Sequence, residues 1–266
     1  MAMLTKHDSK KTVQNPIFIT IKDENGNLNI SKNETKNYVL NFKEHQTNYN
    51  IKIAENSHIK LLILSYGLNE ANINLNIEVS RFASVNLIAG FLNKKTNINS
   101  KIYLNEEGAN ANVNSLLISN ENDNQSAYYE IINNAPHTNG NIDVIGIASD
   151  KSRVKVDGIG QINEGMHQSN NFQHLTGIIS DDATIEMNPY LLIDEHDVIA
   201  GHGATVGQID EEVIYYMMSR GIPEEKARLI YIEGLIAPFV NEIFDKDLCE
   251  SFNQQIWGEK EWMLLK

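Results

Sequence analysis

The sequence of 266 residues has one cysteine, five prolines and two tryptophans, and it has fewer basic than acidic residues. Its only thiol, Cys249, excludes an internal disulfide. The formal net charge of −13 argues against a nucleic-acid-binding protein, which needs a concentrated basic face, and it disfavours binding to anionic lipid. No apolar run approaches the roughly 20 residues of a membrane span, and the N-terminus lacks the apolar segment of a secretory signal. We therefore expect an acidic, cytoplasmic protein.

Motifs for nucleophilic catalysis and for phosphate binding are also absent. The sequence contains neither Gly-X-Ser-X-Gly nor the Gly-X4-Gly-Lys phosphate loop, so we do not expect this chain to hydrolyse ATP. Cys249 has no nearby histidine and is interpreted as an inert thiol. The acidic pair Asp181-Asp182 is interpreted as a solvated turn, because adjacent strand residues point to opposite faces.

Asparagine is unusually abundant, with 35 residues, of which 29 precede residue 142. Many alternate with aliphatic residues, as in the segment 72–79, which reads Asn-Ile-Asn-Leu-Asn-Ile-Glu-Val. Strict alternation predicts strands with one buried face, and it places the asparagines on the solvated face. Compositional bias of the genome is an equally good explanation of the abundance itself.

Short alternating segments recur from about residue 16 to 207. Each follows a polar turn and a small residue, and the aliphatic rows begin at Ile59, Val85, Val113, Val154 and Ile185, spaced 26, 28, 41 and 31 residues apart. Repeats of this length that contain only strands favour a parallel β-helix over residues 16–207, behind a polar tail at 1–15. An antiparallel sandwich or jelly roll remains the alternative. The aliphatics expected to face inward are Ile73, Leu75, Ile77, Val85, Leu87, Val113, Val154, Val156 and Ile185.

The pattern becomes helical over residues 208–266. Asp210 is a predicted N-cap, and the first helix ends at Arg220-Gly221. Pro223 suits the first turn of a second helix, which should kink or stop at Pro238. A third helix is predicted over 244–258. Some apolar side chains of these helices are expected to pack on the last coil of the β-helix.

The densest polar cluster comprises the segment 194–197 (Asp-Glu-His-Asp) and His202, which lies between two glycines. Histidines and carboxylates together could bind iron or zinc, although a solvated turn is the simpler interpretation. Gly201 and Gly203 would let another subunit approach the His202 imidazole closely. We interpret His58, His137, His167 and His174 as surface or satisfied residues.

Three segments in this order resemble the SufB/SufD family of iron–sulfur cluster assembly proteins, and most closely its SufD branch. They are the His-Gly-Ala-Thr core at 202–205, the Ser-Arg-Gly break at 219–221 and the Glu-Gly pair at 233–234. The resemblance implies a mainly β fold, a right-handed parallel β-helix with a small α-helical C-terminal domain. It also implies a non-catalytic scaffold that pairs with a SufB-like subunit through the β-helix and binds a SufC-like ABC ATPase through the C-terminal helices.

The resemblance also assigns site residues. The family's interface histidine corresponds to His202, which would serve cluster assembly and could bind iron together with a partner. ATPase docking is expected at Ile214, Met217, Met218, Arg220, Ile230 and Leu235. Compared with the family pattern, we expect most of an N-terminal helical region to be missing, and Ala200 stands where some SufD proteins have cysteine. With one thiol it should hold no cluster stably, so the cluster thiolates would come from the partner and any iron here would be transient.

Two other functions remain open. A carbohydrate enzyme would need converging acids and an aromatic row, and neither is present in the sequence. A self-pairing β-helix scaffold, dimeric when isolated and without a direct role in cluster assembly, fits the same residues. Co-purification with an ABC ATPase would distinguish it from an assembly subunit.

Overall fold

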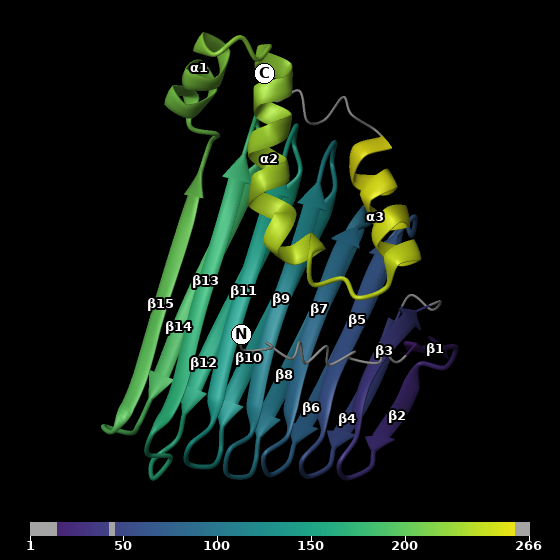
Figure 1. Ribbon diagram of the computed structural model, residues 1–266, viewed down its shortest axis with the longest axis vertical. Helices are drawn as coiled ribbons and strands as arrows, with labels where there is room; N and C mark the ends of the chain where they lie inside the picture. Colours follow the sequence, from purple (N-terminus) through teal and green to yellow (C-terminus); the bar gives the residue numbers. More distant parts are fainter. Residues whose placement is uncertain (1–14, 43–45, 259–266) are drawn as a thin grey trace, which may run out of the picture.

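Two parallel sheets face each other in the computed structural model, which describes residues 15–42 and 46–258 (Figure 1). The chain alternates between the sheets, so that each coil contributes one strand to each. The eight-stranded sheet has the order β1 (Ile17–Ile21), β3 (Thr35–Phe42), β5 (His58–Tyr66), β7 (Ser84–Leu92), β9 (Asn110–Ser119), β11 (Asn139–Ala148), β13 (Ser169–Ile179) and β15 (Val198–Gly207). The seven-stranded sheet has the order β2 (Asn25–Ile30), β4 (Gln46–Ile53), β6 (Glu70–Val79), β8 (Lys95–Leu104), β10 (Asn124–Asn133), β12 (Arg153–Ile162) and β14 (Thr184–Ile193).

Neighbouring strands pair in parallel throughout the described residues. This confirms the parallel β-helix and rules out the antiparallel sandwich. The tail predicted for residues 1–15 lies, apart from Asn15, outside the described residues.

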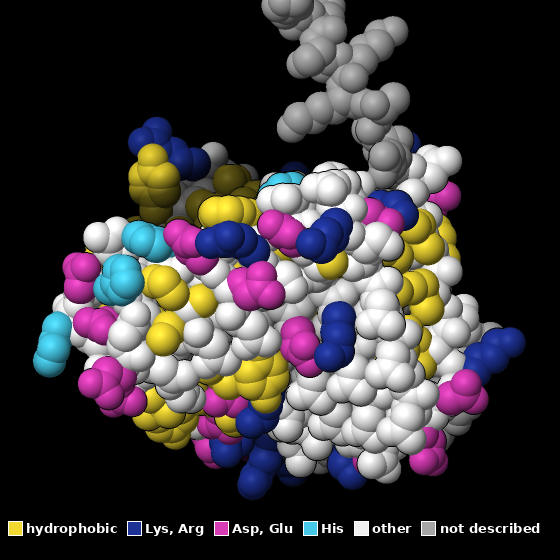
Figure 2. Space-filling view, turned by 90° about the horizontal axis from the view of Figure 1, so that it is seen from below, with side chains coloured by type: hydrophobic (Ala, Val, Ile, Leu, Met, Phe, Trp, Pro, Cys, Tyr) yellow, Lys and Arg dark blue, Asp and Glu magenta, His cyan; other side chains and the backbone are white. Residues whose placement is uncertain are grey.

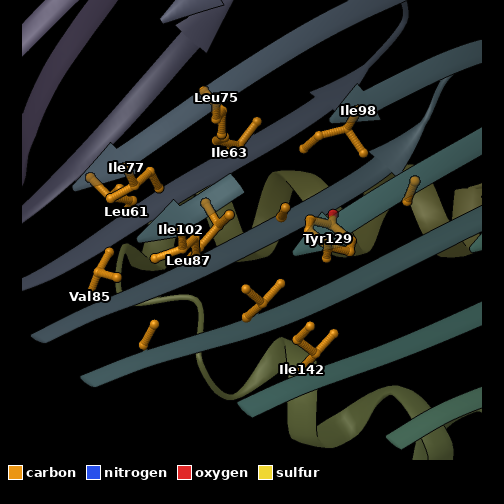
Figure 3. Packing of buried hydrophobic residues seen from close by; sticks show 14 of the residues in the cluster. Leu61, Ile63, Leu75, Ile77, Val85, Leu87, Ile98, Ile102, Tyr129 and Ile142 are labelled. Atoms are coloured by element: carbon orange, nitrogen blue, oxygen red, sulfur yellow. The ribbon is translucent and has the colours of Figure 1, made fainter. Parts of the chain in front are cut away.

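The main core fills the space between the two sheets (Figure 3). All the aliphatic residues predicted to face inward lie in this core. Ile185, at 8% exposed, is the least buried of them. Tyr129 is fully buried in this core, where its hydroxyl lies 2.7 Å from Ser115 Oγ. Because Ser115 Oγ donates to the Ala89 carbonyl, the tyrosine hydroxyl is the donor in that pair.

Asparagine ladders cover the outer face of the seven-stranded sheet. Asn50 Nδ2 donates to Asn27 Oδ1 at 3.1 Å, and Asn76 Nδ2 donates to Asn50 Oδ1 at 3.2 Å. In-register parallel pairing stacks identical residues one coil apart, which gives each amide a partner above and below. The ladders explain why a weak strand former is accommodated here.

Three helices follow the solenoid: α1 (Glu211–Ser219), α2 (Glu224–Val240) and α3 (Lys246–Gly258). Asp210 caps α1 as predicted, its carboxylate accepting the Glu212 N–H at 2.9 Å. Helix α2 continues for two residues past Pro238 before it ends. Among the described residues, no helix has the length and apolar character needed to cross a lipid bilayer.

Helices α2 and α3 lie across the outer face of the eight-stranded sheet, away from the last coil (Figure 1). Phe239 and Phe252 form a second core with Leu62 and other outward-facing sheet residues. At Gly90, an added Cβ would lie 2.6 Å from Phe252, so only glycine admits the ring. The sequence predicts that apolar helical side chains pack on the last coil. Helices α2 and α3 instead pack over earlier coils, because the strands there carry apolar residues on both faces of the sheet.

Candidate functional site

The described sheets end in a strand edge at both ends of the solenoid, and the C-terminal pair of edge strands contains His202. Strands β14 and β15 are the outermost strands of their sheets, and each pairs on one side only among the described residues. Large apolar side chains surround these edges: Tyr190 is 49% exposed, Leu192 52%, Ile199 64% and Val206 42%. A free edge with apolar neighbours is a template for pairing with another chain. We call these two strands the free end.

His202 lies in the middle of β15 and is exposed. Its register partner is Gln173 of β13, an inward-facing residue, so the imidazole belongs to the inner row of the solenoid where no further coil covers it. Gly201 and Gly203 lie on the opposite face of the strand, where an added Cβ would come no closer than 3.4 Å to any atom. The two glycines therefore leave the strand open to close approach from outside.

Gln173 was missed by the sequence analysis. The residue is completely buried, and its Nε2 donates to the Tyr190 carbonyl at 2.7 Å, which joins β13 to β14 beneath the histidine. Gly158 makes room for this amide, since a Cβ there would lie 3.1 Å from Gln173 Oε1. The signal in the sequence is a glutamine at an inward position of an alternating strand.

The acidic cluster at 194–197 forms a turn. The Glu195 carboxylate accepts backbone N–H groups of Gly165, His196 and Asp197, at 2.9, 2.7 and 3.2 Å. The hydrogen bonds donated by the backbone N–H groups of Asp197, His196 and Gly165 lower the pKa of this carboxyl group. His196 lies in the turn, whereas His202 lies four residues into the strand from Val198, about 13 Å further along. The structure therefore separates the two histidines that the sequence placed in one cluster.

The described residues contain no group of three or more histidine, cysteine or acidic side chains placed to hold a metal ion. Burial raises the pKa of the Cys249 thiol, and the nearby Glu250 carboxylate adds to this effect. The thiolate that a cluster would need is thus disfavoured at Cys249. Asp181 also proves to be a turn residue, since it accepts the Asp150 N–H and the Ser180 hydroxyl.

The C-terminal helices present a second surface. On α1, Val213 (38% exposed), Tyr215 (74%), Tyr216 (59%) and Met218 (42%) face outward, and we call these four residues the α1 patch. Ile230 of α2 and Arg220 are exposed as well, and the Arg220 guanidinium lies 5.3 Å from the centre of the Tyr216 ring.

One of the predicted docking residues is corrected by the structure. Ile214 is 1% exposed and packs in the protein's own second core, so its side chain cannot contact a partner. Met217 and Leu235 are half-buried against the same core. The two tyrosines of the α1 patch were overlooked because helical periodicity alone does not reveal which side faces the sheet.

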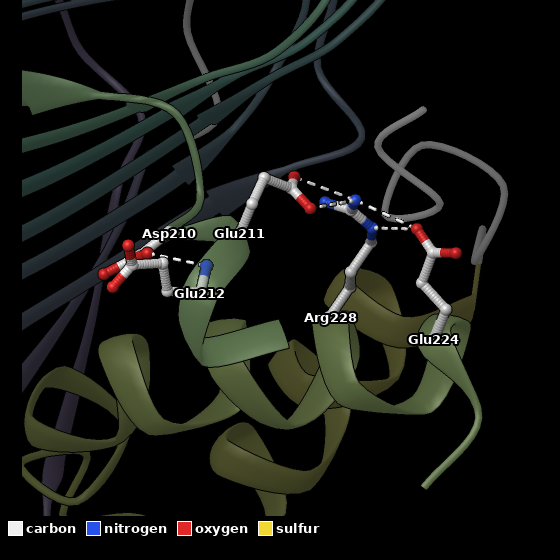
Figure 4. A network of polar contacts seen from close by, with 5 residues as sticks. All are labelled: Asp210, Glu211, Glu212, Glu224 and Arg228. Carbon is white, nitrogen blue, oxygen red and sulfur yellow. Dashed lines mark hydrogen bonds and ion pairs between the residues drawn. The ribbon is translucent and has the colours of Figure 1, made fainter. Parts of the chain in front are cut away.

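An ion-pair network fixes α1 relative to α2 (Figure 4). Arg228 of α2 donates to Glu211 on α1 at 2.9 Å and to Glu224 in its own helix at 3.0 Å. The Arg228 side chain is only 11% exposed, so these carboxylates neutralise a largely buried charge. The α1 patch is consequently held on a defined support.

The described chain is a parallel β-solenoid in which the outermost strands β14 and β15, together with helix α1, carry exposed large apolar side chains. The profile of the SUF system FeS cluster assembly SufBD core domain matches residues 4–235, and the chain belongs to this family.

Curated relatives agree with the family assignment. The iron-sulfur cluster assembly protein SufD of Bacillus subtilis is 44% identical over 99 residues, which cover 37% of this chain and 23% of the relative. SufD of Escherichia coli is 30% identical over 223 residues, 79% of this chain and 51% of the relative. SufB of Bacillus subtilis is 32% identical over 143 residues, 53% of this chain and 30% of the relative. The chain thus spans about half or less of each of these relatives.

Proposed function

We propose that this chain is a SufD-like scaffold subunit of a cytoplasmic iron–sulfur cluster assembly complex. In this proposal the free end pairs with a SufB-like subunit, the α1 patch docks a SufC-like ABC ATPase, and the chain itself catalyses nothing. The observation that carries the proposal is His202, exposed at the middle of an edge strand that pairs on one side only among the described residues, in a member of the SufBD family.

The role of His202 follows from its position at the edge. A partner strand beside β15 would enclose the imidazole between two subunits, where a ring nitrogen can accept a proton or bind iron delivered as cargo. This chain has one thiol with a raised pKa, so the thiolates for the nascent cluster come from the partner. The histidine then contributes to a site that neither subunit completes alone.

The pairing step is tested by reversing the character of the free edge. Ile199→Lys places a charge on an exposed edge residue, which should abolish retention of a SufB-like subunit in co-expression pull-downs without unfolding the protein. Phe18→Lys is the matched control, because Phe18 is 54% exposed on β1 at the opposite end of the same sheet. Equal retention by both variants would contradict the assignment of the interface.

The docking step is tested on α1. Tyr215→Ala should weaken retention of the ATPase while the SufB-like subunit is retained, and Ile199→Lys should have the opposite pattern. The two variants thereby separate the two surfaces. If the isolated chain is a dimer that Ile199→Lys dissociates, and neither partner is ever retained, the protein is a self-pairing scaffold and the proposal fails.

The role of the histidine is tested last. His202→Ala changes an exposed residue and should shift the melting temperature by no more than about 2 °C. The variant should assemble with both partners but fail to support cluster formation, whereas His174→Ala, an exposed histidine of the adjacent strand, should behave as wild type. Normal cluster formation by His202→Ala would show that the residue has no role in assembly.

A further inference from the structure

Histidines recur at the same turn of successive coils. His137 lies between β10 and β11, His167 between β12 and β13, and His196 between β14 and β15. The spacings of 30 and 29 residues match the length of one coil, as in the ladder bonds 29 and 31 residues apart. Figure 2 looks onto these turns and shows histidine side chains gathered toward one end of the face, among carboxylates.

His137 and His167 are in direct contact. Their ring centres lie 5.4 Å apart with the planes at 79°, and the backbone N–H of His137 donates to the backbone carbonyl of His167 at 3.1 Å. Two imidazoles that share one tetrahedral ion, with bonds of about 2.1 Å, have ring centres about 5 Å apart. The distance between the two ring centres is thus close to that of a histidine pair sharing one ion, and both residues are exposed.

A hydrogen bond of the His167 ring leaves one of its nitrogens available as a ligand. Its Nδ1 lies 3.2 Å from the Gly165 carbonyl, which can only accept, so the proton is on Nδ1 and the lone pair of the neutral ring is on Nε2. A backbone carbonyl that fixes the tautomer in this way is a usual partner of a metal-binding histidine. Glu164 in the same turn and Asp197 in the next add negative charge that favours a cation.

From this geometry we propose that His137 and His167 bind a divalent transition metal ion of the imidazole-preferring class, Zn²⁺, Ni²⁺ or Co²⁺, which links two successive coils. Water completes the coordination, since the described residues place no third ligand beside the pair. This site is independent of the proposed assembly function and of His202.

The experiment is a titration of the tag-free full chain with Zn²⁺. Calorimetry measures the binding, and the melting temperature is measured with and without the ion. Wild type should bind one equivalent and melt at a higher temperature in its presence, because the ion binds only the folded coils. His137→Asn is the appropriate variant: His137 has a φ of 57°, and asparagine occupies the corresponding positive-φ turn position at Asn56, so the backbone is preserved. His167→Gln removes the second ligand.

Each variant should weaken zinc affinity by at least about tenfold. Loss of a residue that only hydrogen-bonds to a metal ligand already has an effect of this size, and these variants remove a ligand itself. His174→Ala, an exposed histidine on the outer face of β13, should leave the affinity unchanged. The proposal is overturned if wild type binds no zinc, if His174→Ala weakens binding as much as His137→Asn, or if both ligand variants bind as tightly as wild type.

Discussion

The two sheets of the solenoid have the same parallel pairing but opposite outer faces. In the seven-stranded sheet, β6 alternates along its whole length between buried aliphatic residues and outward-facing asparagines or glutamates. In the eight-stranded sheet, β9 ends in a continuous buried run that includes Leu116, Leu117 and Ile118. The inward-facing residues are mostly buried in both sheets, so the difference between the sheets lies on their outer faces.

This contrast teaches how a solenoid specifies where its helices pack. Strict alternation marks the sheet that faces water, and consecutive apolar residues mark the sheet that must be covered on both sides. Residues Leu62, Ile88 and Leu116 lie on the outer face yet are completely buried, because α2 and α3 cover them. The helices are therefore part of the fold, whatever else they bind.

The largest effect is expected from uncovering the apolar outer face. Deletion of residues 208–266 exposes a row of aliphatics, each worth about 1.5–3 kcal/mol of burial, so the truncated chain should aggregate. Soluble yield and binding of a hydrophobic dye measure this outcome, with deletion of only 259–266 as the control that keeps all three helices. A monomeric truncated chain that melts like wild type would contradict the comparison.

A smaller effect is expected at Gly90, beneath α3. In Gly90→Ala the new Cβ would meet Phe252 at 2.6 Å, with Leu64 and Phe239 at 3.0 Å, and the free energy of unfolding should fall by about 1–3 kcal/mol. In Gly234→Ala, on α2, no atom lies within 4 Å, so the same change should stabilise by about 0.5–1 kcal/mol. Urea unfolding measures the change in the free energy of unfolding for both variants. A change of the same sign in both would show that Phe252 of α3 is not tightly packed against Gly90.

The interior that both sheets share is tested by pH. Burial raises the pKa of Tyr129 far above its usual value, and the smaller effect of its hydrogen bond with Ser115 opposes this shift. The folded state therefore keeps a proton that the unfolded chain loses above about pH 10, and stability should be complete below that pH and fall as pH rises. Urea unfolding between pH 8 and 11 should show a shallower decline for Tyr129→Phe, and an unchanged slope would contradict this.

The smallest effect is expected on the solvated face. Asn50→Ala breaks two ladder bonds between exposed amides and should change the free energy of unfolding by no more than about 0.5 kcal/mol. Its neighbour Ile51 is completely buried, and Ile51→Ala should cost about 2–5 kcal/mol. A loss above about 1.5 kcal/mol for Asn50→Ala would mean that the ladders stabilise the coils directly.

Much of the fold could be predicted from the sequence, because alternation records which side chains face inward. Rows such as Ile73, Leu75 and Ile77 identify the inner face without any structure, and the Asp210 cap fixes the start of α1. The position of the helices over earlier coils was not foreseen, although the run Leu61-Leu62-Ile63 carries the signal. A continuous apolar run has no period from which a single buried face can be chosen.

The candidate site was predictable only in part. His202 could be identified through a family motif, but its exposure depends on which strand ends the sheet, and that follows from three-dimensional pairing. Ile214 was misassigned because an amphipathic helix shows which residues share a face and not what lies opposite. His137 and His167 meet only because the coil between them has the right length.

The in-register stacking of asparagines carries a consequence for how such a chain changes over time. Ladder partners are separated by 23 residues at Asn25–Asn48, 26 at Asn48–Asn74, 29 at Asn110–Asn139 and 31 at Asn139–Asn170. Gain or loss of one complete coil leaves every other pair in phase, whereas a single residue inserted within a strand exchanges inside and outside up to the next turn. We therefore expect changes of length that preserve this fold to comprise whole coils or to fall in the turns.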